Sequence, residues 1–102
     1  MNAEKFNKIL KYCWDKKVYV TPIHFSETVY IKGKVYEGGK WYIAVDQPFG
    51  RTIYNKPVAS GNMIGSATHP EVQKAIERTY EYYFNKIQNA IKRKNKKYQK
   101  KI

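Results

Sequence analysis

Hydrophobic and polar residues alternate along one stretch of the chain, from residue 29 to residue 46. A period of two is typical of β-strands, because successive side chains point to opposite faces. A glycine pair interrupts the alternation and predicts a three-residue turn, Glu37 to Gly39, between two strands. In that register Val35 faces Trp41, and the apolar residues of both strands share one side. The stretch therefore predicts a β-hairpin at the centre of the fold.

The opposite face of this hairpin combines aromatic rings with positive charges, and its residues are Tyr30, Lys32, Lys34, Tyr36 and Tyr42. Aromatic rings stack on nucleic-acid bases and lysines neutralise phosphates, so such a face suits a single strand. The alternative interpretation is an ordinary solvated face whose tyrosines cover neighbouring hydrophobic surface. The hairpin alone does not decide between the two.

Two segments show helical spacing, one before and one after the strands. In residues 2–16, apolar side chains recur at intervals of three and four, and Asn2 is the expected N-cap. Cys13 lies on that apolar stripe, so it is expected to pack in the core. A second stripe extends over residues 69–91, with Thr68 as the expected cap at its start. The sequence thus predicts a short N-terminal helix and a long C-terminal helix.

Short strands are predicted on both sides of the hairpin. Residues 18–25 form the first, and Pro22, which has no N–H to donate, places that strand at an edge or a bulge. Residues 52–54 and 58–59 are further short strands, and 60–68 is a loop of small residues. The predicted fold class is α+β: a small SH3-like antiparallel β-barrel, or a strongly bent sheet of 4–5 strands, between the two helices.

Two motifs in the strand region resemble the Sm-like family, which includes the bacterial Hfq proteins. The first is Ile31-Lys32-Gly33-Lys34-Val35 followed by Trp41-Tyr42-Ile43-Ala44-Val45, and the second is Ile53-Tyr54-Asn55-Lys56-Pro57-Val58. The second is similar to the tyrosine-lysine-histidine run that contacts RNA in that family, with Pro57 in place of the histidine. Gly38-Gly39 replaces the aspartate that is usual in the hairpin turn. The resemblance implies an Sm-like barrel that forms homo-oligomers through strand edges and binds single-stranded RNA or DNA.

The chain is strongly basic, with 20 Lys and Arg against 8 Asp and Glu and a formal net charge of +12. An AT-rich genome would raise Glu as well as Lys, so composition bias does not explain 17 Lys against 6 Glu. A polyanionic partner is therefore expected. The excess is greatest at the C-terminal end, which divides the chain into a single domain, 1–91, and a basic extension, 92–102, that orders on an anionic partner.

Several classes of protein are disfavoured by what the sequence lacks. Cys13 is the only cysteine, which leaves no internal disulfide or thiolate zinc site and fits a reducing, cytoplasmic compartment. No apolar run suits a signal peptide or a membrane segment. No metal-ligand spacing, cofactor motif or catalytic motif is found. A toxin-like ribonuclease that combines His24 and His69 with Arg51 or Lys56 is the enzyme left open.

These observations favour a non-enzymatic, nucleic-acid-binding protein with weak sequence preference and no cofactor. Its cations are expected on the strands and in the tail, at Lys32, Lys34, Lys40, Arg51, Lys56, Lys92, Arg93, Lys94, Lys96, Lys97, Lys100 and Lys101. Tyr30, Tyr36 and Tyr42 are the expected stacking platforms. The alternative is a small accessory protein, from a phage or mobile element, that binds a larger replication, polymerase or defence enzyme.

Overall fold

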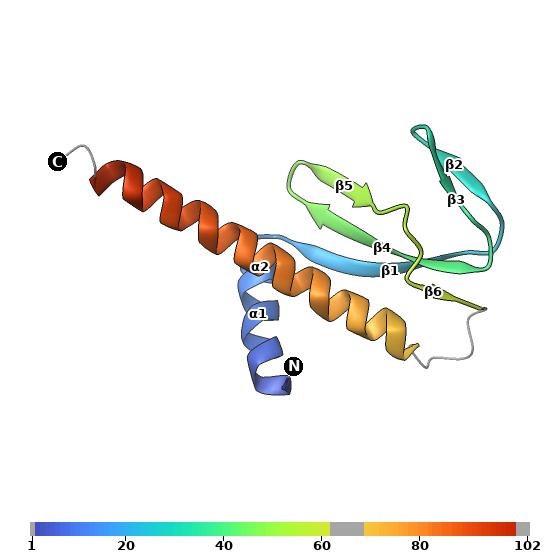
Figure 1. The fold of residues 1–102 in the computed structure, drawn as a ribbon, viewed down its shortest axis with the longest axis horizontal. Coiled ribbons are helices and arrows are strands. Elements are labelled where there is room, and N and C mark those ends of the chain that lie inside the picture. Colours follow the sequence, from blue (N-terminus) through green and yellow to red (C-terminus); the bar gives the residue numbers. More distant parts are fainter. Residues whose placement is uncertain (1, 62–68, 100–102) are drawn as a thin grey trace.

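The computed structural model describes residues 2–61 and 69–99, and they form an α+β fold (Figure 1). A helix precedes six described strands and a long helix follows them, which confirms the predicted fold class. The elements are α1 (Ala3–Asp15), β1 (Tyr19–Phe25), β2 (Val29–Ile31), β3 (Lys34–Tyr36), β4 (Lys40–Gln47), β5 (Gly50–Ile53), β6 (Ala59–Ser60) and α2 (Pro70–Gln99).

The strands are organised around one long, bent hairpin. β1 pairs antiparallel with β4 from Tyr19↔Asp46 to Phe25↔Lys40, and β2 pairs with β3 in the same register beyond a break of three residues on each side. Lys32 and Gly33 form the two-residue turn, with φ of 49° and 80°. Both central residues of a type I′ hairpin turn have positive φ, as these two residues do. The hairpin is therefore closed at Lys32-Gly33.

The predicted hairpin turn at residues 37–39 is therefore wrong. Trp41 pairs with His24 rather than with Val35, which pairs with Tyr30. The glycine pair lies instead at the bend between β3 and β4, where Gly38 lies against the backbone of Glu27. A Cβ atom on Gly38 would lie 2.8 Å from the Glu27 Cα, so only glycine fits there. The glycines thus permit the bend, and the positive φ at residue 32 supplies the turn.

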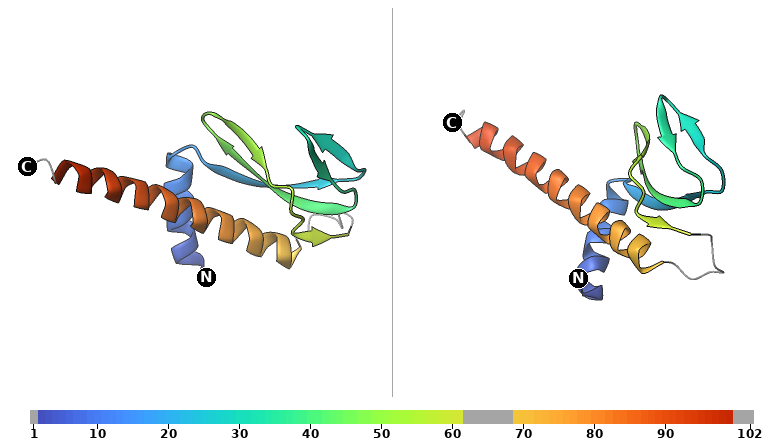
Figure 2. Two further views of the ribbon diagram at one scale, coloured as in Figure 1. Left: turned by 45° about the horizontal axis from the view of Figure 1, so that its top comes forward. Right: turned by 45° about the vertical axis from the view of Figure 1, so that its right-hand side comes forward.

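Beyond the bend, the β2–β3 ribbon folds back on the side of the sheet away from α2 (Figures 1 and 2). The Tyr36 hydroxyl donates to the Ile53 carbonyl oxygen on β5 at 2.6 Å. The Tyr36 ring also packs on Phe25 and Tyr42, with ring centroids 5.5 and 5.2 Å away. Tyr36 and Tyr42 are only 2% and 1% exposed. Both were predicted to be stacking platforms, and that prediction is wrong because the bend buries them in a second, aromatic core.

The main core lies on the other face of the sheet, between β1, β4 and the two helices. Ile43 and Val45 of β4 face the helices, and Cys13 of α1 is fully buried among them, which confirms its predicted packing role. Burial raises the pKa of the Cys13 thiol. The Tyr80 hydroxyl accepts hydrogen bonds from the Val20 amide and the Trp14 indole, at 3.0 and 3.1 Å. One tyrosine of α2 therefore joins α1 and β1.

The sheet is open and bent. Its order is β1-β4-β5, and β6 pairs with a different part of β4 than β5 does. In the described residues no strand closes a barrel. Of the two predicted architectures, the bent sheet is the one observed. β1 lies at an edge, as Pro22 predicted, because an edge strand does not need every N–H. The resemblance to the Sm-like family stays a prediction.

Of the two predicted helix caps, Asn2 and Thr68, only Asn2 lies in the described residues. Asn2 caps α1, since its side chain accepts from the Lys5 amide at 2.7 Å. The predicted cap of the long helix, Thr68, and most of the predicted loop 60–68 lie outside the described residues.

The second helix continues to Gln99, past the predicted end at residue 91. Lysine, arginine and glutamine are good helix formers, and no glycine or proline interrupts the segment. The C-terminal part of α2 extends beyond the sheet (Figure 1), and the radius of gyration is 16.5 Å, against ~13 Å for a compact chain of this size. Within the described ranges, neither helix has an apolar stretch long enough to cross a membrane.

Candidate functional site

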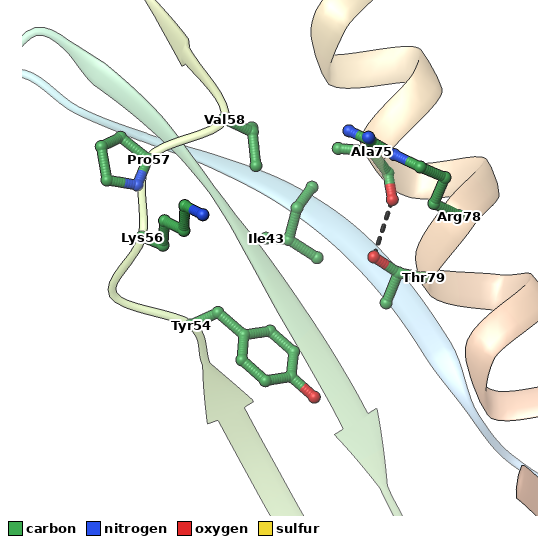
Figure 3. A pocket seen from close by; sticks show the side chains of 8 residues that line it. All are labelled: Ile43, Tyr54, Lys56, Pro57, Val58, Ala75, Arg78 and Thr79. Atoms are coloured by element: carbon green, nitrogen blue, oxygen red, sulfur yellow. Dashed lines mark hydrogen bonds between the residues drawn. The ribbon is translucent and has the colours of Figure 1, made fainter.

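A cleft of about 450 Å³ lies between α2 and the segment that connects β5 to β6 (Figure 3). Its floor is mainly apolar, and two cationic side chains lie at its sides. The lining residues are Ile43, Tyr54, Lys56, Pro57, Val58, Ala75, Arg78 and Thr79. A cleft of this size is comparable with sites that hold one small ligand or one nucleotide-sized group.

The connecting segment is held at both ends by β4. The Tyr54 amide donates to the Ile43 carbonyl oxygen at 3.0 Å, and the Val58 amide donates to the Trp41 carbonyl oxygen at 2.9 Å. The three residues between these anchors, 55–57, are free of sheet pairing and bend outward. Lys56, the middle one of these three residues, lines the cleft (Figure 3).

The helix side of the cleft follows from helical periodicity. Ala75, Arg78 and Thr79 are spaced by three and four residues and so share one face of α2. The Thr79 hydroxyl donates to the Ala75 carbonyl oxygen at 2.7 Å, which satisfies it within the helix. The guanidinium group of Arg78 is left as the polar group that this face offers to a ligand.

The charges of the cleft are not compensated by carboxylates. In the part of the chain that the structure describes, the ion pairs are Lys40–Glu37 at 2.5 Å and Arg51–Asp46 at 2.6 Å. Neither Lys56 nor Arg78 takes part in them, and both are exposed. No acidic side chain lines the cleft. The site therefore presents two positive charges over an apolar floor, which suits an anionic ligand with an apolar, flat part.

Tyrosines extend the cleft along α2. A second hollow, of about 280 Å³, shares Tyr54, Arg78 and Thr79 with the first and adds Tyr82. Tyr54 and Tyr82 are 38% and 57% exposed. The Tyr54 hydroxyl is 2.6 Å from that of Tyr83, and burial, together with this hydrogen bond, raises the pKa of Tyr83. Tyr54 is thereby fixed in position, with part of its ring open to a ligand.

The predicted site residues on the hairpin lie elsewhere. Tyr30 is 75% exposed on the β2–β3 ribbon, and Lys32 and Lys34 are exposed at the tip of the same ribbon. None of the residues that line the cleft belongs to the ribbon. The predicted set is thus divided among the ribbon, strands β4 and β5, the cleft and the long helix.

Two of the predicted phosphate contacts are already engaged by carboxylates. Lys40 pairs with Glu37, and the hydrogen bond and the charge of that carboxylate raise the pKa of Lys40. Arg51 makes two hydrogen bonds to Asp46, at 2.6 and 3.0 Å, and these bonds hold the pKa of Asp46 below its usual value. Of the predicted strand cations, Lys56 is the one that lines the cleft.

The predicted tail residues are divided by the end of the described structure. Lys92 and Arg93 are exposed on α2, and the backbone of Lys94, Lys96 and Lys97 belongs to the same helix. Lys100 and Lys101 lie outside the described residues.

Both histidine rings lie near the ring of Trp41 and away from Arg51. The His24 and His69 rings are 4.9 and 6.0 Å from the Trp41 ring, between centroids. Arg51 pairs with Asp46, which lies five positions after Trp41 in β4. At ~3.4 Å per residue, Asp46 and Trp41 are ~17 Å apart along the strand. The ribonuclease grouping of both histidines with Arg51 is therefore not formed. Across residues 2–61 and 69–99, no three metal-ligating side chains come together.

Besides Tyr54, the charged and aromatic site residues that the sequence reasoning missed are Arg78 and Tyr82. They lie four residues apart in the long helix, a spacing that places them on one face, and this was the available signal. Tyr54 belongs to the segment that resembles the second Sm-like motif, but the sequence did not predict it to be a site residue. That Tyr54 and Lys56 face Arg78 depends on how α2 crosses the sheet, which periodicity does not fix.

No known protein family, characterised protein or solved structure matches this chain. The cleft, its charges and its aromatic residues are therefore the basis for a functional conclusion.

Proposed function

We propose that this protein is a non-enzymatic, cytoplasmic protein that binds single-stranded nucleic acid in the cleft between α2 and the 54–58 segment. The observation that carries the proposal is the pairing of two uncompensated cations, Lys56 and Arg78, with the partly exposed rings of Tyr54 and Tyr82. Cations contact the phosphates and aromatic rings stack on the bases of a single strand.

Single strands are favoured over duplexes because the aromatic rings are accessible only to unstacked bases. A base of a duplex already stacks on its neighbours, so Tyr54 and Tyr82 add little there. Stacking on a ring tolerates every base, which implies weak sequence preference. The formal net charge of +12 adds a long-range attraction for any polyanion.

Fluorescence anisotropy with labelled single-stranded RNA, single-stranded DNA and duplex DNA of equal length tests the proposal. At moderate salt, we expect at least tenfold tighter binding of one of the single strands than of the duplex. The logarithm of the affinity should fall linearly with the logarithm of the salt concentration, by ~0.7 for each phosphate contacted on a single strand.

Equal affinity for all three nucleic acids would mean that charge alone drives binding and that the tyrosines play no part. Absence of binding to all three would reject the proposal. It would favour the second candidate function, an accessory protein that binds a larger enzyme, for which the exposed rings of Tyr30 and Phe49, at 75% and 83%, are the supporting observation.

A further inference from the structure

One face of α2 presents a continuous row of exposed polar and aromatic side chains that starts at the cleft. The row consists of Arg78, Tyr82, Lys86, Asn89 and Arg93, which follow one another at intervals of four, four, three and four residues. These intervals keep side chains on one helical face. All five residues are exposed.

The first members of the row belong to the candidate site. Arg78 and Tyr82 line the second hollow of the cleft. The Lys86 ammonium group lies 6.0 Å from the Tyr82 ring centroid and 5.7 Å from that of Tyr83. The row is therefore continuous with the cleft. The Tyr82 ring lies between the cations Arg78 and Lys86, an arrangement in which the ring can stack on a base while the cations contact phosphates.

The rest of the row extends away from the sheet. The C-terminal part of α2 continues past the strands (Figure 1), and Asn89 and Arg93 are both exposed. From Tyr82 to the end of the helix at Gln99 the sequence has no acidic residue. No carboxylate on this part of α2 would repel a polyanion.

We infer that a single strand bound in the cleft continues along this row of α2, so that the binding site extends from Lys56 to Arg93. The inference rests on the proposed function, and it adds the length and the path of the ligand. Beyond Tyr82, the last row residue that lines a hollow, residues 82 to 93 span ~16 Å of helix at ~1.5 Å per residue. At the ~3.4 Å spacing of a stacked strand, this corresponds to about five nucleotides beyond the cleft.

Oligonucleotides of two lengths separate the cleft from the row. We compare single strands of ~4 and ~12 nucleotides, by competition in anisotropy, on the full chain and on the variant Lys86→Gln/Arg93→Gln. The longer strand should lose about tenfold in affinity in the variant, and the salt slope should fall by ~1.4, whereas the shorter strand should bind as before. The control Lys8→Gln/Lys11→Gln removes the same charge from exposed positions of α1 and should change neither affinity.

Each other outcome has a distinct meaning. If the wild-type chain binds neither strand, the proposed function itself fails. If it binds both with equal affinity, or if the α1 control loses as much as the α2 variant, the row is not part of the site and the inference is overturned. A duplex of the longer length is titrated in the same way. If the α2 variant loses more affinity for this duplex than for the long single strand, the row is a duplex-binding surface and the inference is also overturned.

Discussion

Replacing Lys56 and Arg78 together by glutamine is expected to lower the affinity for a single strand about a hundredfold. Each cation lines the cleft without a carboxylate partner among the described residues, so each is available to a phosphate. A hydrogen bond to a charged group contributes roughly 1.5–3 kcal/mol, and the loss of two at the lower limit is about 3 kcal/mol, or two orders of magnitude. Anisotropy with one fixed oligonucleotide measures the change.

The chain offers a matched control for this variant. Lys40→Gln/Arg51→Gln also removes two positive charges, but both are already paired, with Glu37 and Asp46. Its affinity should change by no more than a few-fold, since exposed paired charges contribute little. Equal losses in the two double variants would show that only net charge matters, and the cleft would lose its assigned role.

Replacing Tyr42 by alanine is expected to lower the free energy of unfolding by about 3–5 kcal/mol, the usual cost of truncating a buried aromatic side chain. Tyr42 is 1% exposed, and its hydroxyl accepts a hydrogen bond from the Glu37 amide at 2.6 Å. Denaturant unfolding, followed as a shift of the midpoint at constant slope, measures the change. If the variant does not fold, Tyr42→Phe removes only the hydroxyl, and a loss of about 1–2 kcal/mol is then expected.

Tyr30→Ala is the control, because it makes the same chemical change at a residue that is 75% exposed. Its free energy of unfolding should stay within about 0.5 kcal/mol of that of the wild type. If Tyr42→Ala kept full stability and lost affinity for single strands instead, Tyr42 would be a stacking residue and the buried aromatic core would be contradicted.

The elements whose identity depends on local sequence were predicted correctly. Helix α1 follows from the spacing of its apolar residues and from the cap at Asn2. Pro22 indicated an edge strand, and β1 lies at an edge. Neighbouring residues fix these features, so no information about distant parts of the chain was needed.

The hairpin register was not predictable from alternation, because the observed register pairs Val29 with Tyr36 and Ile31 with Lys34 and so does not keep the apolar residues on one side. A turn at 37–39 groups the apolar residues on one side, whereas the observed turn at Lys32-Gly33 buries both faces of β4. In the observed register a Cβ atom on Gly38 would clash with the backbone of Glu27, a contact between residues 11 positions apart that alternation does not encode. The same error made Tyr36 and Tyr42 seem exposed. The predicted register placed them on one solvated face of the hairpin, whereas both are buried.

The candidate site was predicted only at Lys56. The cleft forms where α2 passes the 54–58 segment, and the residues that face each other across it are at least 17 positions apart in the sequence. Composition indicated a polyanionic partner, but it did not show which cations are paired. Arg51 is paired because the register of β4 and β5 sets it opposite Asp46, and Lys40 pairs with Glu37, three residues before it.

The most direct test of the central claim is a map of backbone amide shifts by NMR, with the full chain labelled with nitrogen-15 and titrated with a single strand of about six nucleotides. The account predicts that the largest changes occur at residues 54–58 and 75–82 and continue toward residue 93. Changes confined to the β2–β3 ribbon or to the turn around Phe49 would contradict it, because the cleft would then not be where the strand binds.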